Sequence, residues 1–264
     1  MGPPSPLPAP KGWNSVVTSS TDQQRGSYQQ QEADFDAARG LPCLATGMAE
    51  YEQAIAPFKQ RLFHQLAEGA LQPAAASGRA AEVLELGIGT GPNLAFYGAN
   101  SSSSSGQILN VHITGVDPNP YMLPHLQDAA AQLGWPDDRL TWVEGQAEAL
   151  PLPDASVDAV VCTLVLCSVP DVPAVLREVK RVLRPGGAFL FIEHTIAGQD
   201  RFLLQLGQRA FNPLQQLLAD GCRLTRDPLP VIEAAGFPGG IDATRFEVEG
   251  MALIAPHVAG IGWA

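Results

Sequence analysis

The segment from Val83 to Gly91 constrains the fold of this chain most strongly, because it joins a buried strand to a tight turn. Its sequence is VLELGIGTG. Residues 83–86 form an apolar run suited to a strand inside a parallel sheet. Gly87, Gly89 and Gly91 allow the backbone to turn sharply and to approach a ligand closely, since they lack a Cβ atom. The segment therefore predicts an α/β fold with a ligand site at the end of its first strand.

The same loop discriminates between two kinds of ligand. A dinucleotide site needs a third glycine at position 92, opening a helix that faces a pyrophosphate, but this chain has Pro92 there. Glu85, two positions before the first glycine, would crowd an anion, whereas a sulfonium cation tolerates a carboxylate. We therefore expect Glu85 and the three glycines to bind S-adenosylmethionine, and a dehydrogenase is disfavoured. The alternative is that the loop is only a tight turn.

A second acidic residue follows the next expected strand. Residues 109–117 read LNVHITGVD and end at Asp117, whose carboxylate can accept hydrogen bonds from both ribose hydroxyls of the cofactor. Pro118 and Asn119 follow and are expected at the same site. Asp117 could instead cap the next helix, because aspartate is a favoured cap.

Three further strands are expected along the chain, at residues 140–145, 157–162 and 188–194. Gln146 and Ala147 follow the first of these, where an adenine ring would lie against the sheet edge, and Thr163 follows the second. A helix is expected near residues 172–183. This alternation of strands with helices predicts one doubly wound α/β domain.

Composition excludes some classes of partner. The chain has 264 residues, with 16 Lys and Arg against 27 Asp and Glu, for a net charge of −11. An acidic chain opposes a nucleic-acid substrate, so no nucleic-acid partner is expected. The four cysteines show no C-x-x-C pair and no histidine at ligand spacing in the sequence, which indicates neither a zinc site nor a disulfide framework. No metal is expected.

The N-terminal region differs from the rest. Residues 1–47 are rich in Pro, Ser and Gln, and we expect a disordered polar tail before a methyltransferase domain at residues 48–264. We expect no secretory signal, and a cytoplasmic location, with an organellar stroma as the alternative. The serines at 101–105 are expected to form a surface insertion.

Residues 51–66 have the apolar spacing of an amphipathic helix, with Lys59 and Arg61 assigned to its polar side. Three interpretations stay open: a lid over the cofactor, a helix packed on the sheet, or a helix bound at a membrane surface. The apolar run at residues 159–169 is too short to cross a bilayer, so no transmembrane segment is expected, although peripheral membrane contact is possible.

Several longer strings resemble one family. VDAVVCTLVLCSV, LREVKRVLRPGGAFLFIEH, DGCRLTRDPLPVIEAAGF and PHVAG are similar to segments of the methyltransferase-like alkyl-thiol S-methyltransferases, and the similarity covers about residues 48–260. The more restricted motifs are Asp220-Gly221-Cys222, Thr225-Arg226 and Pro256-His257. The resemblance implies the class I methyltransferase fold, a seven-stranded sheet of order 3-2-1-4-5-7-6 with strand 7 antiparallel. It also implies a small-molecule acceptor, a thiol in the animal members.

The chemistry sets the expected catalytic residues. Methyl transfer is an in-line displacement, and a thiol with a pKa near about 8.5 is partly ionised at neutral pH, so a thiol acceptor needs no strong base. An oxygen acceptor would need one, for which His194 is the candidate, although it could simply cap its strand. Asp220 and Arg226 either line the acceptor pocket, in an expected helical region over residues 199–238, or pair with each other. His257 is expected to be structural.

Two other functions stay open. The acceptor could be a quinone or another lipid-like carbon or oxygen atom, or the chain could bind S-adenosylmethionine without catalysis, as an interaction protein. An arsenite methyltransferase would need cysteines arranged to capture a metalloid, and Cys162, Cys167 and Cys222 show no such pattern in the sequence.

Overall fold

The computed structural model describes residues 16–17, 28, 42–98, 110–219 and 221–264. Its sheet has the strand order β1-β4-β3-β2-β5-β6-β8-β7, in which β8 runs antiparallel to both neighbours. Apart from the two-residue edge strand β1, this is the predicted order 3-2-1-4-5-7-6 with strand 7 antiparallel. The strands are β1 (Val16–Val17), β2 (Ala81–Leu86), β3 (Val111–Asp117), β4 (Leu140–Glu144), β5 (Val157–Thr163), β6 (Leu183–His194), β7 (Ile241–Glu247) and β8 (Pro256–Trp263).

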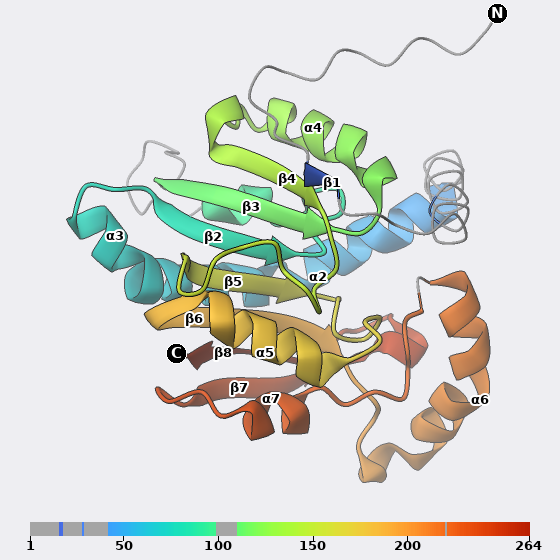
Figure 1. Cartoon of the computed structure of the whole chain (residues 1–264). Helices are drawn as coiled ribbons and strands as arrows, with labels where there is room; N and C mark the ends of the chain where they lie inside the picture. The colour runs from blue at the N-terminus through green and yellow to red at the C-terminus, as the bar shows by residue number, and fades with distance from the viewer. Residues whose placement is uncertain (1–15, 18–27, 29–41, 99–109, 220) are drawn as a thin grey trace, which may run out of the picture.

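Helices cover both faces of the sheet, as a doubly wound fold requires. In Figure 1, α5 and α7 lie in front of the sheet, while α2 passes behind it. The α-helices are α2 (Pro42–Leu66), α3 (Gln72–Ala76), α4 (Leu123–Gln132), α5 (Val172–Val182), α6 (Phe202–Leu218) and α7 (Leu229–Ala235). A π-helical turn, η1 (Ala67–Leu71), joins α2 to α3, and short 3₁₀ turns include η2 (Leu94–Tyr97) and η3 (Pro120–Met122).

The strand residues alternate between two separate cores. Val83 and Val161 belong to the core beneath α2, α3 and α4, whereas Leu84 and Val160 belong to the core beneath α5 and α7. Each parallel strand is therefore buried on both faces, which explains why these strands read as continuous apolar runs. Because β2 to β6 are parallel, their carboxyl ends meet at one edge of the sheet, and the candidate site lies along that edge.

The predicted N-terminal tail differs from the structure at two places. Val16 and Val17 form β1, which pairs in parallel with Val143 and Glu144 of β4. Helix α2 begins at Pro42, inside the expected tail. The boundary at residue 48 stays a prediction, and the serines at 101–105 lie outside the described residues.

Helix α2 packs on the sheet, which is one of its three predicted placements, while a lid role over the cofactor stays a prediction. Leu62, Phe63 and Leu66, near its carboxyl end, are buried in the sheet core, while Tyr51 and Ile55 pack with Val248 in a smaller cluster. The assignment of Lys59 to the polar side was wrong. This side chain is 1% exposed, and its ammonium lies 2.6 Å from the carboxylate of Glu52, which neutralises a charge that burial would otherwise disfavour.

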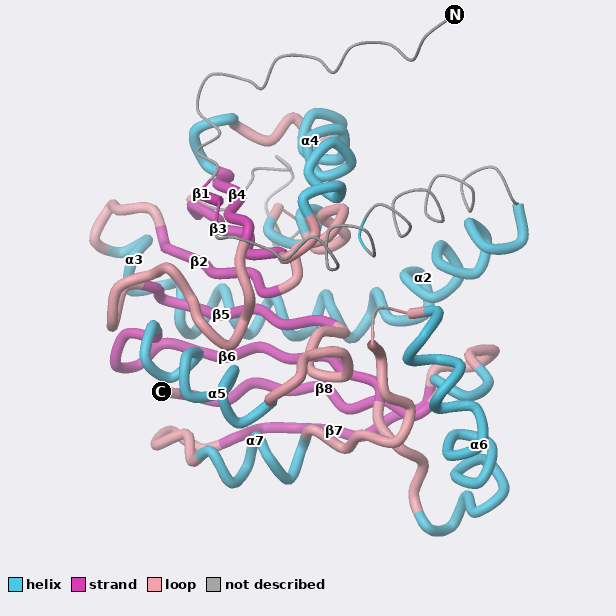
Figure 2. Tube along the Cα trace, turned by 45° about the vertical axis from the view of Figure 1, so that its right-hand side comes forward, coloured by secondary structure: helices cyan, strands magenta, loops and turns pink. Residues whose placement is uncertain are grey.

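Helix α6 stands beyond the edge of the sheet toward which the parallel strands point, in both views (Figures 1 and 2). Together with α7 it accounts for the helical region expected over residues 199–238. Its exposed large apolar side chains are Phe202, Leu203, Leu206, Phe211, Leu214 and Leu217. Within the described residues, no helix is both long and apolar enough to cross a membrane.

Candidate active site

The glycine loop after β2 adopts a backbone that side chains disfavour. Gly87, Gly89 and Gly91 have φ values of 58°, 51° and 78°, in the left-handed region. A Cβ atom at Gly87 would lie 2.5 Å from the side chain of Val165, so this glycine is needed for packing. At Gly89 a Cβ would meet only the oxygen of Gly87, at 3.9 Å. Gly89 therefore faces open space, as a loop that admits a ligand must.

Asp117 holds this loop in place. One carboxylate oxygen accepts a hydrogen bond from the Gly89 N–H, and the other accepts from the Asn119 N–H, both at 2.8 Å. The helix cap considered for Asp117 is instead formed by Asn119, whose side chain accepts a hydrogen bond from the Tyr121 N–H at 3.0 Å. A carboxylate oxygen can accept more than one hydrogen bond, so the two loop contacts do not by themselves exclude a ribose contact. The ribose contact itself stays a prediction.

Glu85 lies beneath the loop. Its carboxylate accepts hydrogen bonds from Tyr97 Oη at 2.8 Å and from Asn93 Nδ2 at 2.9 Å, and the residue is 1% exposed. Burial raises the pKa of Glu85 to about 7, although the two hydrogen bonds and nearby Lys59 oppose that shift. Both oxygens of Glu85 thus support the segment that follows the loop. Its expected contact with the cofactor stays a prediction.

Asn93 links the glycine loop to the next strand. Its Nδ2 also donates to Thr163 Oγ1 at 3.0 Å, at the carboxyl end of β5. Its Oδ1 is buried and has no hydrogen-bond partner among the described residues. A buried acceptor without a donor is costly, and an ammonium group would satisfy it. Together with the open space at Gly89, this orphaned oxygen fits the amino-acid end of S-adenosylmethionine.

The other predicted cofactor residues lie along the same edge. Pro118 and Asn119 follow β3, and Gln146 and Ala147 follow β4, where the Gly145 N–H donates to the Asp117 carbonyl. Ala147 is buried and Gln146 is exposed. The structure thus gathers the predicted residues at the carboxyl ends of β2 to β5, while their contacts with cofactor stay predictions.

The loop after β5 is organised by a carboxylate that the sequence analysis missed. Glu193 accepts hydrogen bonds from the N–H groups of Val165 and Leu166, both at 2.9 Å, and from that of Cys167 at 3.3 Å. Glu193 is fully buried, and burial raises its pKa to about 7. Leu164, just before these donors, has a φ of 58°. The sequence did contain a signal for this role, since Glu193 is a charged residue inside the apolar string AFLFIEH. A carboxylate buried in such a strand needs several hydrogen-bond donors around it.

Arg226 supports the same loop. Its Nη1 donates to the carbonyls of Leu166 and Val169, at 2.5 and 2.7 Å. Arg226 therefore fixes the backbone of this loop, and its expected place in the acceptor pocket stays a prediction. Asp220, its expected partner, lies outside the described residues.

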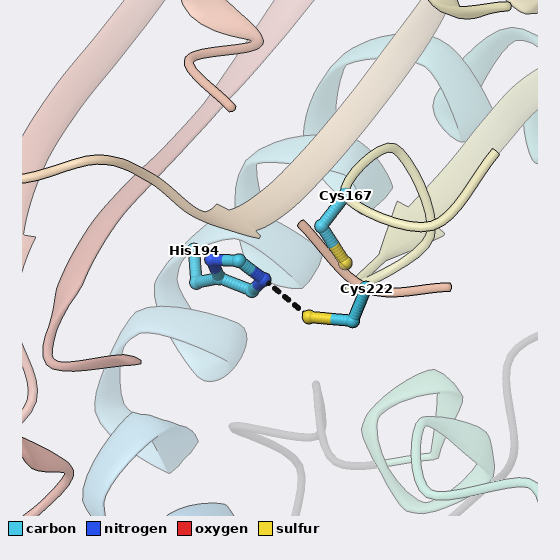
Figure 3. Close-up of side chains that lie close together, drawn as sticks. All are labelled: Cys167, His194 and Cys222. Atoms are coloured by element: carbon cyan, nitrogen blue, oxygen red, sulfur yellow. Dashed lines mark hydrogen bonds between the residues drawn. The ribbon is translucent and has the colours of Figure 1, made fainter. Parts of the chain in front are cut away.

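His194 meets two cysteines that are distant in the sequence. Its Nε2 lies 2.9 Å from Cys222 Sγ, and Cys167 Sγ completes a buried cluster whose three ligand atoms lie within 4.8 Å of one another (Figure 3). Cys167 and then His194, by hydrogen bonding to the thiolate form, hold the pKa of Cys222 well below its usual value. The other ring nitrogen of His194 is buried without a hydrogen-bond partner among the described residues.

This cluster corrects the interpretation of the cysteines. The sequence shows no histidine near them, because 27 residues separate Cys167 from His194 and 28 separate His194 from Cys222. The fold brings all three to the carboxyl edge of β5 and β6. His194 bonds a cysteine rather than the backbone, so it is not the simple strand cap that was considered.

His257 has the structural role that was predicted. It lies opposite His194 in the β6–β8 register, and its Nε2 pairs with Tyr51 Oη at 3.0 Å. Its Nδ1 lies 3.0 Å from the Ala255 carbonyl, so Nδ1 carries the proton and Nε2 accepts from the tyrosine. Burial lowers the pKa of His257 to about 4. His257 thereby joins α2 to the beginning of β8.

Known proteins support the class that the fold and loop define. A family model described as a methyltransferase domain matches residues 84–191. The putative sarcosine dimethylglycine methyltransferase of Galdieria sulphuraria has a solved structure that aligns with a TM-score of 0.53 at 17% identity, covering 77% of this chain and 85% of that one. The protein is therefore a methyltransferase with the class I fold, whose methyl donor is S-adenosylmethionine.

Sequence relatives narrow the class to a family. The human thiol S-methyltransferase TMT1A is 38% identical over 211 residues, which are 80% of this chain and 80% of that protein. The rat thiol S-methyltransferase TMT1B is 37% identical over 199 residues, covering 74% and 73%. The chain belongs to the thiol S-methyltransferase family.

Proposed function

We propose that this protein transfers a methyl group from S-adenosylmethionine to the sulfur of a small-molecule thiol. The observation that carries the proposal is the 38% identity to a thiol S-methyltransferase across 80% of both chains, which includes the glycine loop and the loops after β5 and β6. A small acceptor is consistent with the acidic chain, since a net charge of −11 disfavours a polyanionic substrate.

The reaction requires little proton chemistry. The cofactor supplies a methyl group activated by a positively charged sulfur. A new carbon–sulfur bond forms to the acceptor as the sulfonium carbon–sulfur bond breaks, and S-adenosylhomocysteine leaves with the electron pair. The acceptor proton goes to water. The protein accelerates such a step mainly by aligning the two sulfurs around the methyl group and by excluding water.

The described residues supply that alignment. Asp117 fixes the Gly89 N–H, and Asn93 ties the glycine loop to Thr163. Glu193 and Arg226 fix the loop after β5 through its N–H groups and its carbonyls. Separate sets of hydrogen bonds therefore fix the loop expected to bind the methyl donor and the loop expected to face the methyl acceptor. This favours one relative orientation of the two reactants.

The test is release of S-adenosylhomocysteine by the purified protein, given S-adenosylmethionine and a panel of small alkyl thiols, phenols and quinols. We expect turnover with thiols only. A matched panel of the corresponding methyl thioethers serves as the control. They have the structure of the product but no S–H group that could ionise to a thiolate.

Two results would reject the proposal. Turnover confined to quinols or phenols would assign a carbon or oxygen acceptor. Tight cofactor binding without turnover on any thiol would favour the non-catalytic interpretation.

A further inference from the structure

Three soft ligand atoms converge in the interior at the carboxyl edge of β5 and β6. Cys167 is 2% exposed, His194 3% and Cys222 8%, and their ligand atoms lie within 4.8 Å of one another. Figure 3 shows the three side chains pointing toward one another from the loop after β5, the end of β6 and the segment after α6. Neither the glycine loop nor the Asp117 contacts use any of the three.

Backbone hydrogen bonds fix this convergence. The Arg223 N–H donates to the Cys167 carbonyl at 3.1 Å, which joins the two cysteine segments directly. The Cys222 N–H donates to the Ala219 carbonyl at 2.7 Å, and the Cys167 N–H donates to Glu193. His194 is held by the pairing of β6 with β8. The three ligand atoms are therefore preorganised by the main chain of three separate segments.

The donor set has a clear chemical preference. Two sulfurs and one imidazole nitrogen suit a tetrahedral Zn²⁺ ion, with bonds of about 2.3 Å to sulfur and 2.0–2.1 Å to nitrogen. In such a tetrahedron the ligand atoms lie about 3.5–3.8 Å apart. The 2.9 Å between His194 and Cys222 must lengthen slightly, which a small side-chain rotation allows. Three protein ligands leave one position open, as in catalytic rather than structural zinc sites.

We propose that Cys167, His194 and Cys222 bind one Zn²⁺ ion, and that its fourth position takes the sulfur of the acceptor thiol. The second clause rests on the proposed function and the first does not. The acceptor binds as a thiolate and releases its proton to water, which gives the protein a way to deprotonate and place the thiol without a general base. Cys167 belongs to the loop that follows Thr163, so the ion lies beside the expected cofactor residues.

Metal binding is measured first, without methyl donor or acceptor. The reduced, metal-free protein is titrated with Zn²⁺ by calorimetry and with Co²⁺ by absorption, since Co²⁺ bound to thiolates gives an intense charge-transfer band. We expect one ion per chain. Zn²⁺ should also raise the melting temperature of the unmodified protein, because a ligand that binds only the folded state stabilises it.

Variants assign the ligands. Cys167→Ser, Cys222→Ser and His194→Gln should each weaken Zn²⁺ binding at least tenfold. Cys162→Ser is the matched control, because Cys162 is also a buried free cysteine but hydrogen-bonds Glu193 instead of joining the cluster. Cys162→Ser and Cys43→Ser should bind the ion as the unmodified protein does. Circular dichroism confirms that each variant is folded.

The proposal is overturned if the unmodified protein binds no Zn²⁺ at micromolar concentrations and gains no thermal stability, or if Cys162→Ser weakens binding as much as Cys222→Ser does. The second clause has its own test, in which an alkyl thiol is added to the Co²⁺-loaded protein. A shifted charge-transfer band supports it, and an unchanged band in a protein that methylates the same thiol rejects it. Failure of the proposed function would appear as lost turnover with metal stoichiometry intact.

Discussion

Lys59 Nζ lies 2.6 Å from Glu52 Oε2, two turns earlier on α2, and the two side chains differ sharply in their exposure. Lys59 is 1% exposed, whereas Glu52 is 31% exposed. Lys59 Nζ also lies 5.5 Å from the centre of the Phe96 ring. The buried cation therefore depends on Glu52, while water can solvate Glu52 by itself.

This difference in exposure predicts that neutral substitutions of Glu52 and Lys59 lower the free energy of unfolding by different amounts. Glu52→Gln leaves a buried ammonium without its partner and should lower the free energy of unfolding by about 2–3 kcal/mol. Lys59→Met leaves only a half-exposed carboxylate and should cost about 1 kcal/mol or less. Urea unfolding measures both, with exposed Glu50→Gln as the control. A larger loss for Lys59→Met would show that the ion pair does not control stability here.

Gly89 and Gly78 form a matched pair for testing the cofactor loop. Both have left-handed φ values, 51° and 77°, and neither has a close neighbour where a Cβ atom would stand. Alanine at either position should cost about 1–2 kcal/mol of stability. Only Gly89→Ala should also weaken S-adenosylmethionine binding, by about tenfold or more, because its methyl group occupies ligand space. Calorimetry measures the S-adenosylmethionine affinity of both variants. If the two affinities are equal, the cofactor does not bind against Gly89.

Asp117→Ala should weaken cofactor binding by about ten- to a hundredfold, because a charge-assisted contact to the ribose is lost. The loop contact to Gly89 complicates the interpretation, so the variant is combined with a 2′-deoxy analogue of S-adenosylhomocysteine. If Asp117 binds the hydroxyl, the two losses are less than additive. Additive losses would limit Asp117 to holding the loop. Asp242→Ala, at an exposed position of β7, is the control.

Glu85 should make stability depend on pH. Its pKa is raised from 4.5 to about 7, so between these values the folded state binds a proton that the unfolded state releases. Its contribution to the unfolding free energy is therefore greatest below about pH 4.5 and falls by at most about 1.4 kcal/mol per pH unit up to about pH 7.

The Glu85→Gln variant isolates that contribution. Glu193 and His257 also titrate abnormally in this range, so the quantity to measure is the difference between the unfolding free energies of the two proteins. That difference should decline from pH 5 to 7 and then become constant. Parallel curves for the two proteins would contradict the raised pKa.

Much of the fold could be predicted because it depends on local patterns. The apolar runs expected to end at Leu86, Asp117 and Cys162 are parallel strands, and the glycine loop has the left-handed backbone that its composition predicts. Strand order followed from resemblance to a family rather than from the residues themselves. The edge pairing of Val16 with Val143 could not be predicted, because nothing local marks a contact across 127 residues.

The candidate site was less predictable, since side-chain partners depend on tertiary packing. Glu85 was identified as important, but its orientation toward Tyr97 and Asn93 depends on how the chain turns after the loop. Lys59 has the sequence spacing of a surface residue, but tertiary packing buries it beside Glu52 and the Phe96 ring. The Cys167–His194–Cys222 cluster joins three segments, none of which carries a ligand motif alone.

The short strand β1 has a practical consequence for anyone handling the protein. Val17 pairs with Glu144, two residues before Gln146, so β1 lies on the sheet beside the expected adenine position. Deleting Val16 and Val17 to aid crystallisation, or attaching a bulky affinity tag near residue 16, would expose the unpaired backbone of β4 at that point. Preparations that differ only in their N-terminal design should therefore not be treated as interchangeable in ligand-binding work.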